Sequence, residues 1–175
     1  MNVFNLFLLL SFSITIISCG DFYTSEVPIS NTGNTKIDTN VIGAWAAFKE
    51  DGKLDEAIKI SSIDDYSYIV NFISLTKTGE RLNNYDNFIA YSYTINKQEY
   101  INMRMLNCPE KESYIFYKYE LKDDSLFTYL LSDEKFKKKF KSSKRFKKYI
   151  KENSEDFNDK FEQSYRFVKI YPSPK

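Results

Sequence analysis

The chain has 175 residues, with 25 basic and 24 acidic side chains and a formal net charge of +1. It contains no histidine and two cysteines, which excludes Ser-His-Asp and Cys-His catalysis and a zinc site built from cysteine and histidine. Carboxylate pairs and lysine bases remain, so the composition disfavours an enzyme without excluding one. Tyrosine and phenylalanine supply nearly all of the 17% aromatic residues, and both are frequent in half-buried strands.

The chain opens on an apolar stretch, residues 3–17, that is interrupted only by single Asn, Ser and Thr residues. As a helix this stretch reaches about 22 Å, which is short for the ~30 Å core of a bilayer and typical of a signal peptide. The alternative is an ordinary hydrophobic helix or strand that carries a cysteine by chance. The position, the length and the polar sequence that follows favour a signal peptide over residues 1–18.

The apolar stretch ends in Ile16-Ile17-Ser18-Cys19, which resembles a bacterial lipobox, in which apolar residues and a small residue precede a cysteine. The resemblance implies cleavage before Cys19, a diacylglycerol on its sulfur and attachment to a membrane of the cell envelope. Gly20 follows the cysteine, and Asp21 lies one place beyond the position where aspartate favours the inner membrane. The resemblance therefore implies the outer membrane, although the start of the leader lacks the usual Lys or Arg.

Residues 19–40 are expected to form the lipidated cysteine and a tether. This segment is rich in Ser, Thr, Asn, Gly and Pro, and about 20 flexible residues span on the order of 25 Å. A single domain is expected over residues 41–175. The second cysteine, Cys108, lies in a predicted turn, and no histidine is present to activate it, which favours a structural thiol over a nucleophile.

Eight stretches of the domain have strand character, and turn residues separate several of them. Asn96-Lys97-Gln98 predicts a hairpin, and the Asp64-Asp65 and Asp123-Asp124 pairs lie in predicted turns, where aspartate is frequent for backbone reasons rather than for catalysis. The fold class is therefore mostly β, an antiparallel barrel or meander of about eight strands. The predicted strands are residues 41–48, 57–61, 66–75, 87–95, 99–106, 112–121, 126–131 and 163–171.

The pattern changes at Ser132, after which apolar residues recur at helical spacing before the last strand. This spacing predicts a helical segment over 133–158, with a short helix near 133–140 and a longer one over 143–157. Ten of the seventeen residues from 135 to 151 are Lys or Arg. The charge balance is −8 over residues 20–134 and +9 over residues 135–175.

Two interpretations of this basic, amphipathic segment remain open. It can be a solvated helix face beside an acidic body, with its phenylalanines directed at the core. It can also be a surface for anionic lipid headgroups or an acidic protein partner. Nucleic acid is not expected, because the leader directs the chain out of the cytoplasm. The candidate interaction residues are Lys137, Lys138, Lys147 and Lys148.

Gly43-Ala44-Trp45 stands on the first predicted strand, ahead of a meander, a helix and one last strand. This order resembles the lipocalins, and above all the small lipocalin-like lipoproteins of Gram-negative bacteria. The resemblance implies a barrel in which Trp45 closes one end and an arginine packs on its ring, with Arg166 as the candidate. The other motifs of the family are not evident, the helical segment is longer than usual, and Trp45 can equally be an ordinary core residue.

Two functions are compatible with these features. The first is a non-enzymatic binding module, in which the aromatic residues line a cavity for a small apolar ligand and no cofactor or metal takes part. The second is a structural or interaction lipoprotein with a filled barrel, which acts through its outer surface or its basic helix. The volume of the barrel interior distinguishes the two, since the fold alone does not.

Overall fold

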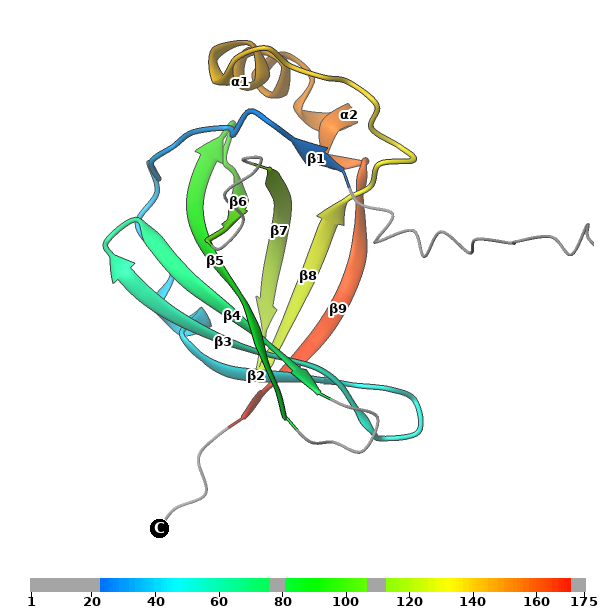
Figure 1. Cartoon of the computed structure of the whole chain (residues 1–175). Coiled ribbons are helices and arrows are strands. Elements are labelled where there is room, and N and C mark those ends of the chain that lie inside the picture. Colours follow the sequence, from blue (N-terminus) through cyan, green and yellow to red (C-terminus); the bar gives the residue numbers. More distant parts are fainter. Residues whose placement is uncertain (1–22, 76–80, 107–112, 171–175) are drawn as a thin grey trace, which may run out of the picture.

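Eight antiparallel strands close into a barrel, seen in a computed structural model that describes residues 23–75, 81–106 and 113–170. Each strand pairs with the next from β2 to β8, and β9 pairs with both β8 and β2 to complete the ring (Figure 1). The predicted fold class is confirmed. The strands are β2 (Gly43–Phe48), β3 (Leu54–Asp64), β4 (Ser67–Leu75), β5 (Arg81–Ile95), β6 (Gln98–Met105), β7 (Tyr114–Lys122), β8 (Ser125–Leu131) and β9 (Phe161–Ile170).

The short turns predicted within the described residues are present. Asn96 and Lys97 join β5 to β6, and both have positive φ angles, 50° and 67°, which suit the twist of a two-residue hairpin. Asp64 accepts a hydrogen bond from the backbone N–H of Tyr66 at 2.8 Å, and Asp123 adopts a φ of 51° between β7 and β8. These aspartates therefore serve the backbone of turns, as the sequence indicates.

Side-chain alternation gives the barrel wall two apolar faces. On β7, Tyr117 and Tyr119 contact the cluster inside the barrel, whereas Tyr114 and Phe116 belong to a second cluster outside it. Since successive side chains of a strand point to opposite faces, one strand supplies both clusters. The helical segment covers the outer cluster, so the barrel has an interior core and an external one.

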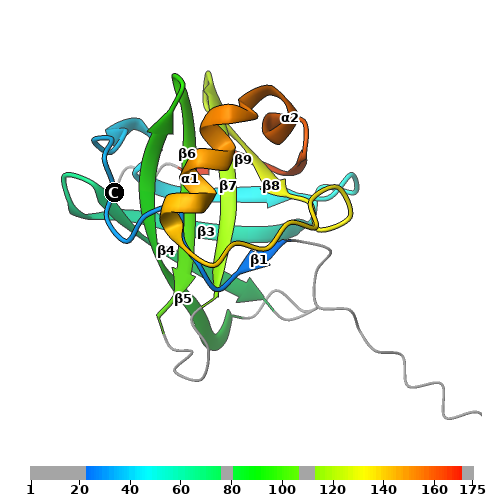
Figure 2. The same cartoon turned by 90° about the horizontal axis from the view of Figure 1, so that it is seen from above.

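Helices α1 (Ser143–Glu152) and α2 (Ser154–Asn158) lie over the outer side of β6 and β7 (Figures 1 and 2). The side chain of Ser142 caps α1 by accepting a hydrogen bond from the N–H of Arg145. No helix in the described ranges has the length and the apolar character needed to cross a membrane.

The short helix expected near 133–140 is not formed, and the segment before Ser143 is a turn followed by irregular backbone. Phe136 and Phe140, whose spacing suggests a helix, pack instead on side chains of α1. The ring of Phe140 stacks on that of Phe146 with 4.4 Å between centroids. The apolar spacing therefore reflects tertiary contacts rather than a helical turn.

The segment before the barrel is packed along the wall from residue 23 onward, so the expected flexible tether is wrong for residues 23–40. Strand β1 (Thr24–Ser25) pairs with β7, and the 3₁₀ helix η1 (Thr39–Val41) leads into β2. Tyr23 and Ile29 are buried in the outer cluster. A few apolar side chains thus hold this polar segment in place, and the structured domain includes it.

Candidate binding site

An apolar cavity of about 80 Å³ lies inside the barrel. It exists because alternate residues of nearly every strand point inward, and their aliphatic and aromatic side chains leave part of the interior unfilled. Its lining includes Val41, Ile58, Ile60, Tyr68, Val70, Phe72, Ala90, Ile101, Met103, Tyr117, Tyr119, Leu126, Thr128, Tyr165 and Phe167.

Five of these residues carry a side-chain hydroxyl group, namely Tyr68, Tyr117, Tyr119, Thr128 and Tyr165. Burial, followed by the nearby Tyr165 and Glu56, raises the pKa of Tyr117 to about 12. Burial also raises the pKa of Tyr165, and the charge of Glu56 adds to the effect. Both phenols are therefore neutral near pH 7 and can donate or accept a hydrogen bond.

Trp45 packs in the interior cluster that also contains most of the residues lining the cavity. It is 1% exposed, and its indole Nε1 donates a hydrogen bond to the carbonyl of Val41 at 2.8 Å. The ammonium of Lys169 lies 5.2 Å from the centre of the Trp45 ring and donates to the carbonyl of Asn40 at 3.0 Å. These contacts confirm that Trp45 is buried and tie η1, β2 and β9 together.

Gly43 is required by the same arrangement. Its φ of 142° is one that residues with a side chain rarely adopt, and a Cβ atom there would lie 3.3 Å from Cε of Lys169. The glycine of the Gly-x-Trp pattern thus allows the backbone to turn into β2 beneath the lysine.

Arg166 does not pack on Trp45, and the residue that does is Lys169. The two basic residues are three positions apart on β9, so they point to opposite faces of the wall. The Arg166 guanidinium lies outside the barrel, 5.6 Å from the centre of the Phe127 ring, and donates to Oγ of Ser125 at 3.3 Å. The expected contact between Arg166 and Trp45 was therefore wrong. A different cation, Lys169, lies over the Trp45 ring.

A polar group that sequence reasoning missed lies on the inner face of β6. Glu99 accepts a hydrogen bond from the hydroxyl of Tyr119 at 3.4 Å, and burial raises the pKa of its carboxyl group. On the same end of the barrel, the hydroxyl of Tyr68 accepts from the N–H of Asp38 at 2.7 Å. In the sequence, the indication of this group was the spacing of two residues between Glu99 and Ile101, which places both side chains on one face of the strand.

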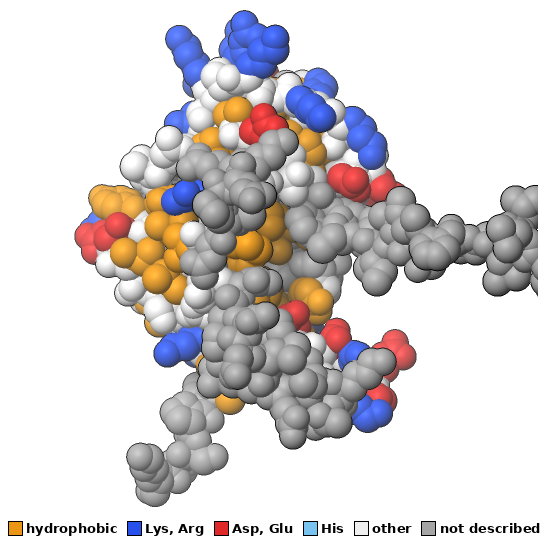
Figure 3. All heavy atoms as spheres, in the orientation of Figure 1, with side chains coloured by type: hydrophobic (Ala, Val, Ile, Leu, Met, Phe, Trp, Pro, Cys, Tyr) orange, Lys and Arg blue, Asp and Glu red, His pale blue; other side chains and the backbone are white. Residues whose placement is uncertain are grey.

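The lysines proposed as an interaction surface lie on one side of the molecule. Lys137, Lys138 and Lys148 are exposed, and Lys147 is half-buried. The Lys138 ammonium lies 4.1 Å from the centre of the Tyr149 ring. We call the exposed cations of this side the basic face, and Figure 3 shows basic side chains gathered over the helices. Its members are Lys137, Lys138, Lys139, Lys141, Lys144, Arg145, Lys148 and Lys151.

A polar recess of about 340 Å³ separates α1 from the β5–β6 hairpin. The side-chain amide of Asn96 bridges the two elements by donating to the carbonyl of Lys151 at 2.8 Å. The Lys147 ammonium lies 4.5 Å from the centre of the Tyr93 ring at the recess. The lining is Asn34, Tyr93, Thr94, Ile95, Asn96, Lys147 and Lys151, which suits an anionic or hydroxyl-rich group.

Neither cysteine belongs to the described ranges, so the predictions for Cys19 and Cys108 lie outside them. Within those ranges, no group of three or more Cys, Asp or Glu side chains is placed to hold a metal ion. No family model, curated protein or solved structure matches the chain. The function must therefore be argued from the chemistry of the cavity and the surface.

Proposed function

We propose that the protein is a non-enzymatic binding module that holds a narrow apolar ligand inside its barrel and is anchored to an envelope membrane through lipid on Cys19. The apolar cavity carries the first part of the proposal, because it is lined by side chains from most strands and contains few polar atoms. The lipobox-like sequence before Cys19 supports the anchor.

The size of the cavity restricts the ligand. A volume of about 80 Å³ is well below the ~300–1,000 Å³ of sites for drug-sized molecules, and below the ~150 Å³ of an apolar cavity that admits benzene. A fused-ring ligand does not fit this volume. An unbranched hydrocarbon chain is narrower than a ring, and because the cavity is open on one side, only the end of the chain has to enter it. Such a chain is therefore the ligand class that the cavity suits best.

The polar atoms of the cavity restrict the other end of the ligand. Tyr117 and Tyr165 offer neutral hydroxyl groups, and the negative charge of Glu56 acts on both phenols. An anionic headgroup next to that carboxylate would be repelled. The arrangement therefore favours an uncharged hydroxyl or carbonyl group over a carboxylate.

Trp45 allows binding to be measured directly, because it is the only tryptophan of the chain and packs in the core that forms the cavity. Addition of 1-decanol should change the fluorescence of Trp45 until the change reaches a plateau. A rigid cage alcohol such as 1-adamantanol should leave the fluorescence unchanged. Ala90→Leu should abolish the response, since Ala90 lines the cavity and a larger side chain there fills it.

Ser61→Leu is the matched control, because it adds the same side chain on the outer face of β3, next to Ile69 in the sheet register. A thermal unfolding curve must show that both variants remain folded, and Ala90→Val can replace the leucine variant if it does not. Equal responses of wild type and a folded cavity-filling variant would show that decanol does not bind in the barrel.

A filled barrel that acts through its surface is the second candidate. The small cavity and the basic face favour it, since most inward side chains are already in contact with one another. Native mass spectrometry of the protein purified from its own envelope would distinguish the two, because the first candidate expects a co-purified apolar molecule and the second a protein partner.

A further inference from the structure

The basic face carries charge that the rest of the protein does not neutralise. Residues 135–151 contain no acidic side chain. In the described ranges, two ion pairs reach them, Lys135 with Glu162 at 2.8 Å and Lys148 with Glu152 at 3.7 Å. The cations of this face without an ion pair there are Lys137, Lys138, Lys139, Lys141, Lys144, Arg145 and Lys151.

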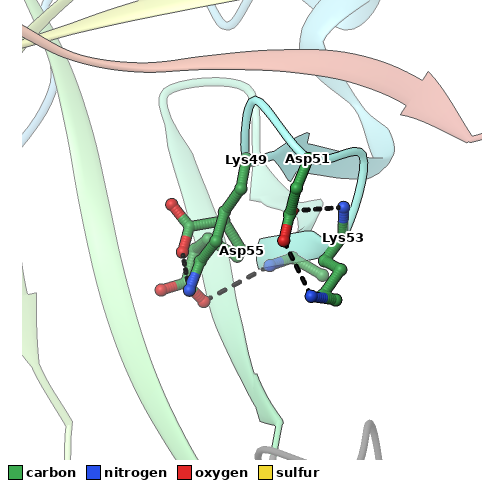
Figure 4. A network of polar contacts seen from close by, with 6 residues as sticks. Lys49, Asp51, Lys53 and Asp55 are labelled. Atoms are coloured by element: carbon green, nitrogen blue, oxygen red, sulfur yellow. Dashed lines mark hydrogen bonds and ion pairs between the residues drawn. The ribbon is translucent and has the colours of Figure 1, made fainter.

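Two lysines on the opposite wall of the barrel, by contrast, form ion pairs with carboxylates. In the β2–β3 loop, Lys53 pairs with Asp51 at 2.8 Å and Lys49 pairs with Asp55 at 3.5 Å (Figure 4). Strands β2 and β3 lie across the ring from β6 and β7, which the helices cover. Carboxylates thus neutralise the two lysines of this loop, whereas most cations of the basic face have no such partner in the described ranges.

An aromatic layer holds the cations of the basic face in place. Phe136, Phe146 and Phe157 are buried beneath the face, and Phe140 stacks on Phe146. Phe146 in turn contacts Phe116 of the barrel wall, with 5.1 Å between ring centroids. The irregular stretch that carries Lys137 to Lys141 is therefore fixed on the barrel and presents its charges on a defined surface.

The chain reaches the barrel at this same side. The backbone N–H of Tyr23 donates to the carbonyl of Leu131 at 2.9 Å, and its hydroxyl donates to the carbonyl of Lys138 at 2.6 Å. Cys19 precedes Tyr23 by four residues, which span at most about 14 Å when extended. A lipid on Cys19 would therefore hold the basic face near the headgroups of the membrane.

From these observations we infer that the basic face docks on an anionic lipid bilayer and orients the barrel on the membrane surface. Charge complementarity identifies the surface, and the position of Tyr23 favours a bilayer over an acidic protein as the occupant. The step that uses Cys19 rests on the proposed anchor, whereas the charge argument does not. The recess with Lys147 and Lys151 offers a place for a headgroup phosphate.

Binding to vesicles tests this inference without the lipid anchor. The full chain with Cys19→Ser is mixed with vesicles of phosphatidylcholine alone or with about one third phosphatidylglycerol, and bound protein is measured by sedimentation. We expect binding to the anionic vesicles to exceed binding to the neutral ones and to weaken as salt rises. The apolar leader is common to all variants, so it does not affect their comparison.

Changing Lys137, Lys139, Lys141 and Lys144 to Gln should weaken binding to the anionic vesicles by about 600-fold, since each of the four cations near such a surface contributes about fivefold. The matched control changes Lys36, Lys49, Lys53 and Lys59 to Gln, which removes the same net charge elsewhere. The control should retain binding within a few-fold.

Equal losses in the two quadruple variants would overturn the inference, because net charge rather than the basic face would then be responsible. Equal binding of wild type to neutral and anionic vesicles would overturn it too. Loss of an acidic protein partner by the face variant with unchanged vesicle binding would assign the face to that partner instead. None of these readouts depends on decanol binding or on acylation, so the proposed function is tested separately.

Discussion

At the scale of single residues, Trp45 links η1, β2 and β9. Its indole N–H holds the last residue of η1, its ring packs in the interior cluster, and Lys169 covers it. Gly43 provides the backbone conformation that lets this arrangement form. The residues of the Gly-x-Trp pattern therefore have a structural reason to be present, whether or not the chain is related to the lipocalins.

Replacing Trp45 by Ala should lower the free energy of unfolding by about 3–5 kcal/mol, as expected for deletion of a large aromatic side chain from a core. Trp45→Phe keeps an aromatic ring and removes the donor to Val41, so it should cost less. Urea denaturation followed by circular dichroism measures both changes. An unfolding midpoint of the alanine variant close to that of wild type would contradict the central position of this residue.

Glu99 makes stability depend on pH. Burial raises the pKa of its carboxyl group above the ordinary value of 4.5, so the folded state binds a proton more tightly than the unfolded state. The resulting stabilisation is complete below that ordinary value and is lost as pH rises through the raised pKa. Glu99→Gln keeps an acceptor for Tyr119 without the charge.

This variant should therefore unfold at a higher temperature than wild type at pH 7, and the difference should disappear below about pH 4.5. Thermal unfolding at a series of pH values measures it. Glu162→Gln is a suitable comparison, because the Lys135 ammonium lowers the pKa of that carboxyl group and the pH dependence should have the opposite sign. A difference for Glu99→Gln that is independent of pH would refute the argument.

At the scale of elements, the helical segment acts as an outer layer of the barrel rather than as an independent unit. Helix α1 has ten residues, which is short for a helix that is stable alone in water, and it carries five Lys or Arg residues. Phe146 and Ile150 are fully buried on its inner side. Packing on β6 and β7 therefore compensates for the repulsion between its charges.

Phe140→Asp should destabilise the protein by at least about 2 kcal/mol, because it places a carboxylate between the rings of Phe136 and Phe146. Lys139→Asp introduces the same side chain at the adjacent exposed position and should change stability by less than about 0.5 kcal/mol. Chemical denaturation measures both. If the two variants were equally stable, the segment before α1 would not be docked as described.

At the scale of the whole molecule, two properties are combined: a closed barrel with a small apolar interior, and a charge distribution that is positive on the helical side. Because the ring of eight strands is closed, it has no exposed edge strand, and the short strand β1 pairs with β7 from outside the ring. The proposed lipid on Cys19 and the basic face would act from the same side of the barrel, which relates the anchor to the orientation of the domain.

The anchor itself is tested in cells. Cys19→Ser should leave an unprocessed precursor or a soluble form, because the serine hydroxyl cannot accept the lipid through a thioether. Cell fractionation and the mobility of the protein on a gel report both outcomes, and Cys108→Ser serves as the control for loss of a thiol. A Cys19→Ser protein that is still processed and recovered with membranes would contradict lipidation.

The sequence by itself determined the strands, most of their turns and the amphipathic character of α1, because alternation, turn residues and helical spacing are local properties. Trp45 was singled out because Gly43-Ala44-Trp45 resembles the first motif of the lipocalins. Tertiary structure alone decided that Lys169 rather than Arg166 covers Trp45, since that depends on the registration of β9 against β2.

Other features also depended on long-range packing. The docking of residues 23–40 and the irregular path of 133–142 result from contacts of Tyr23, Phe136 and Phe140 with distant elements, which local composition does not encode. The volume of the cavity is the difference between the space that eight strands enclose and the side chains that fill it. No local pattern contains that difference, so only the closed barrel could show that the interior is narrow.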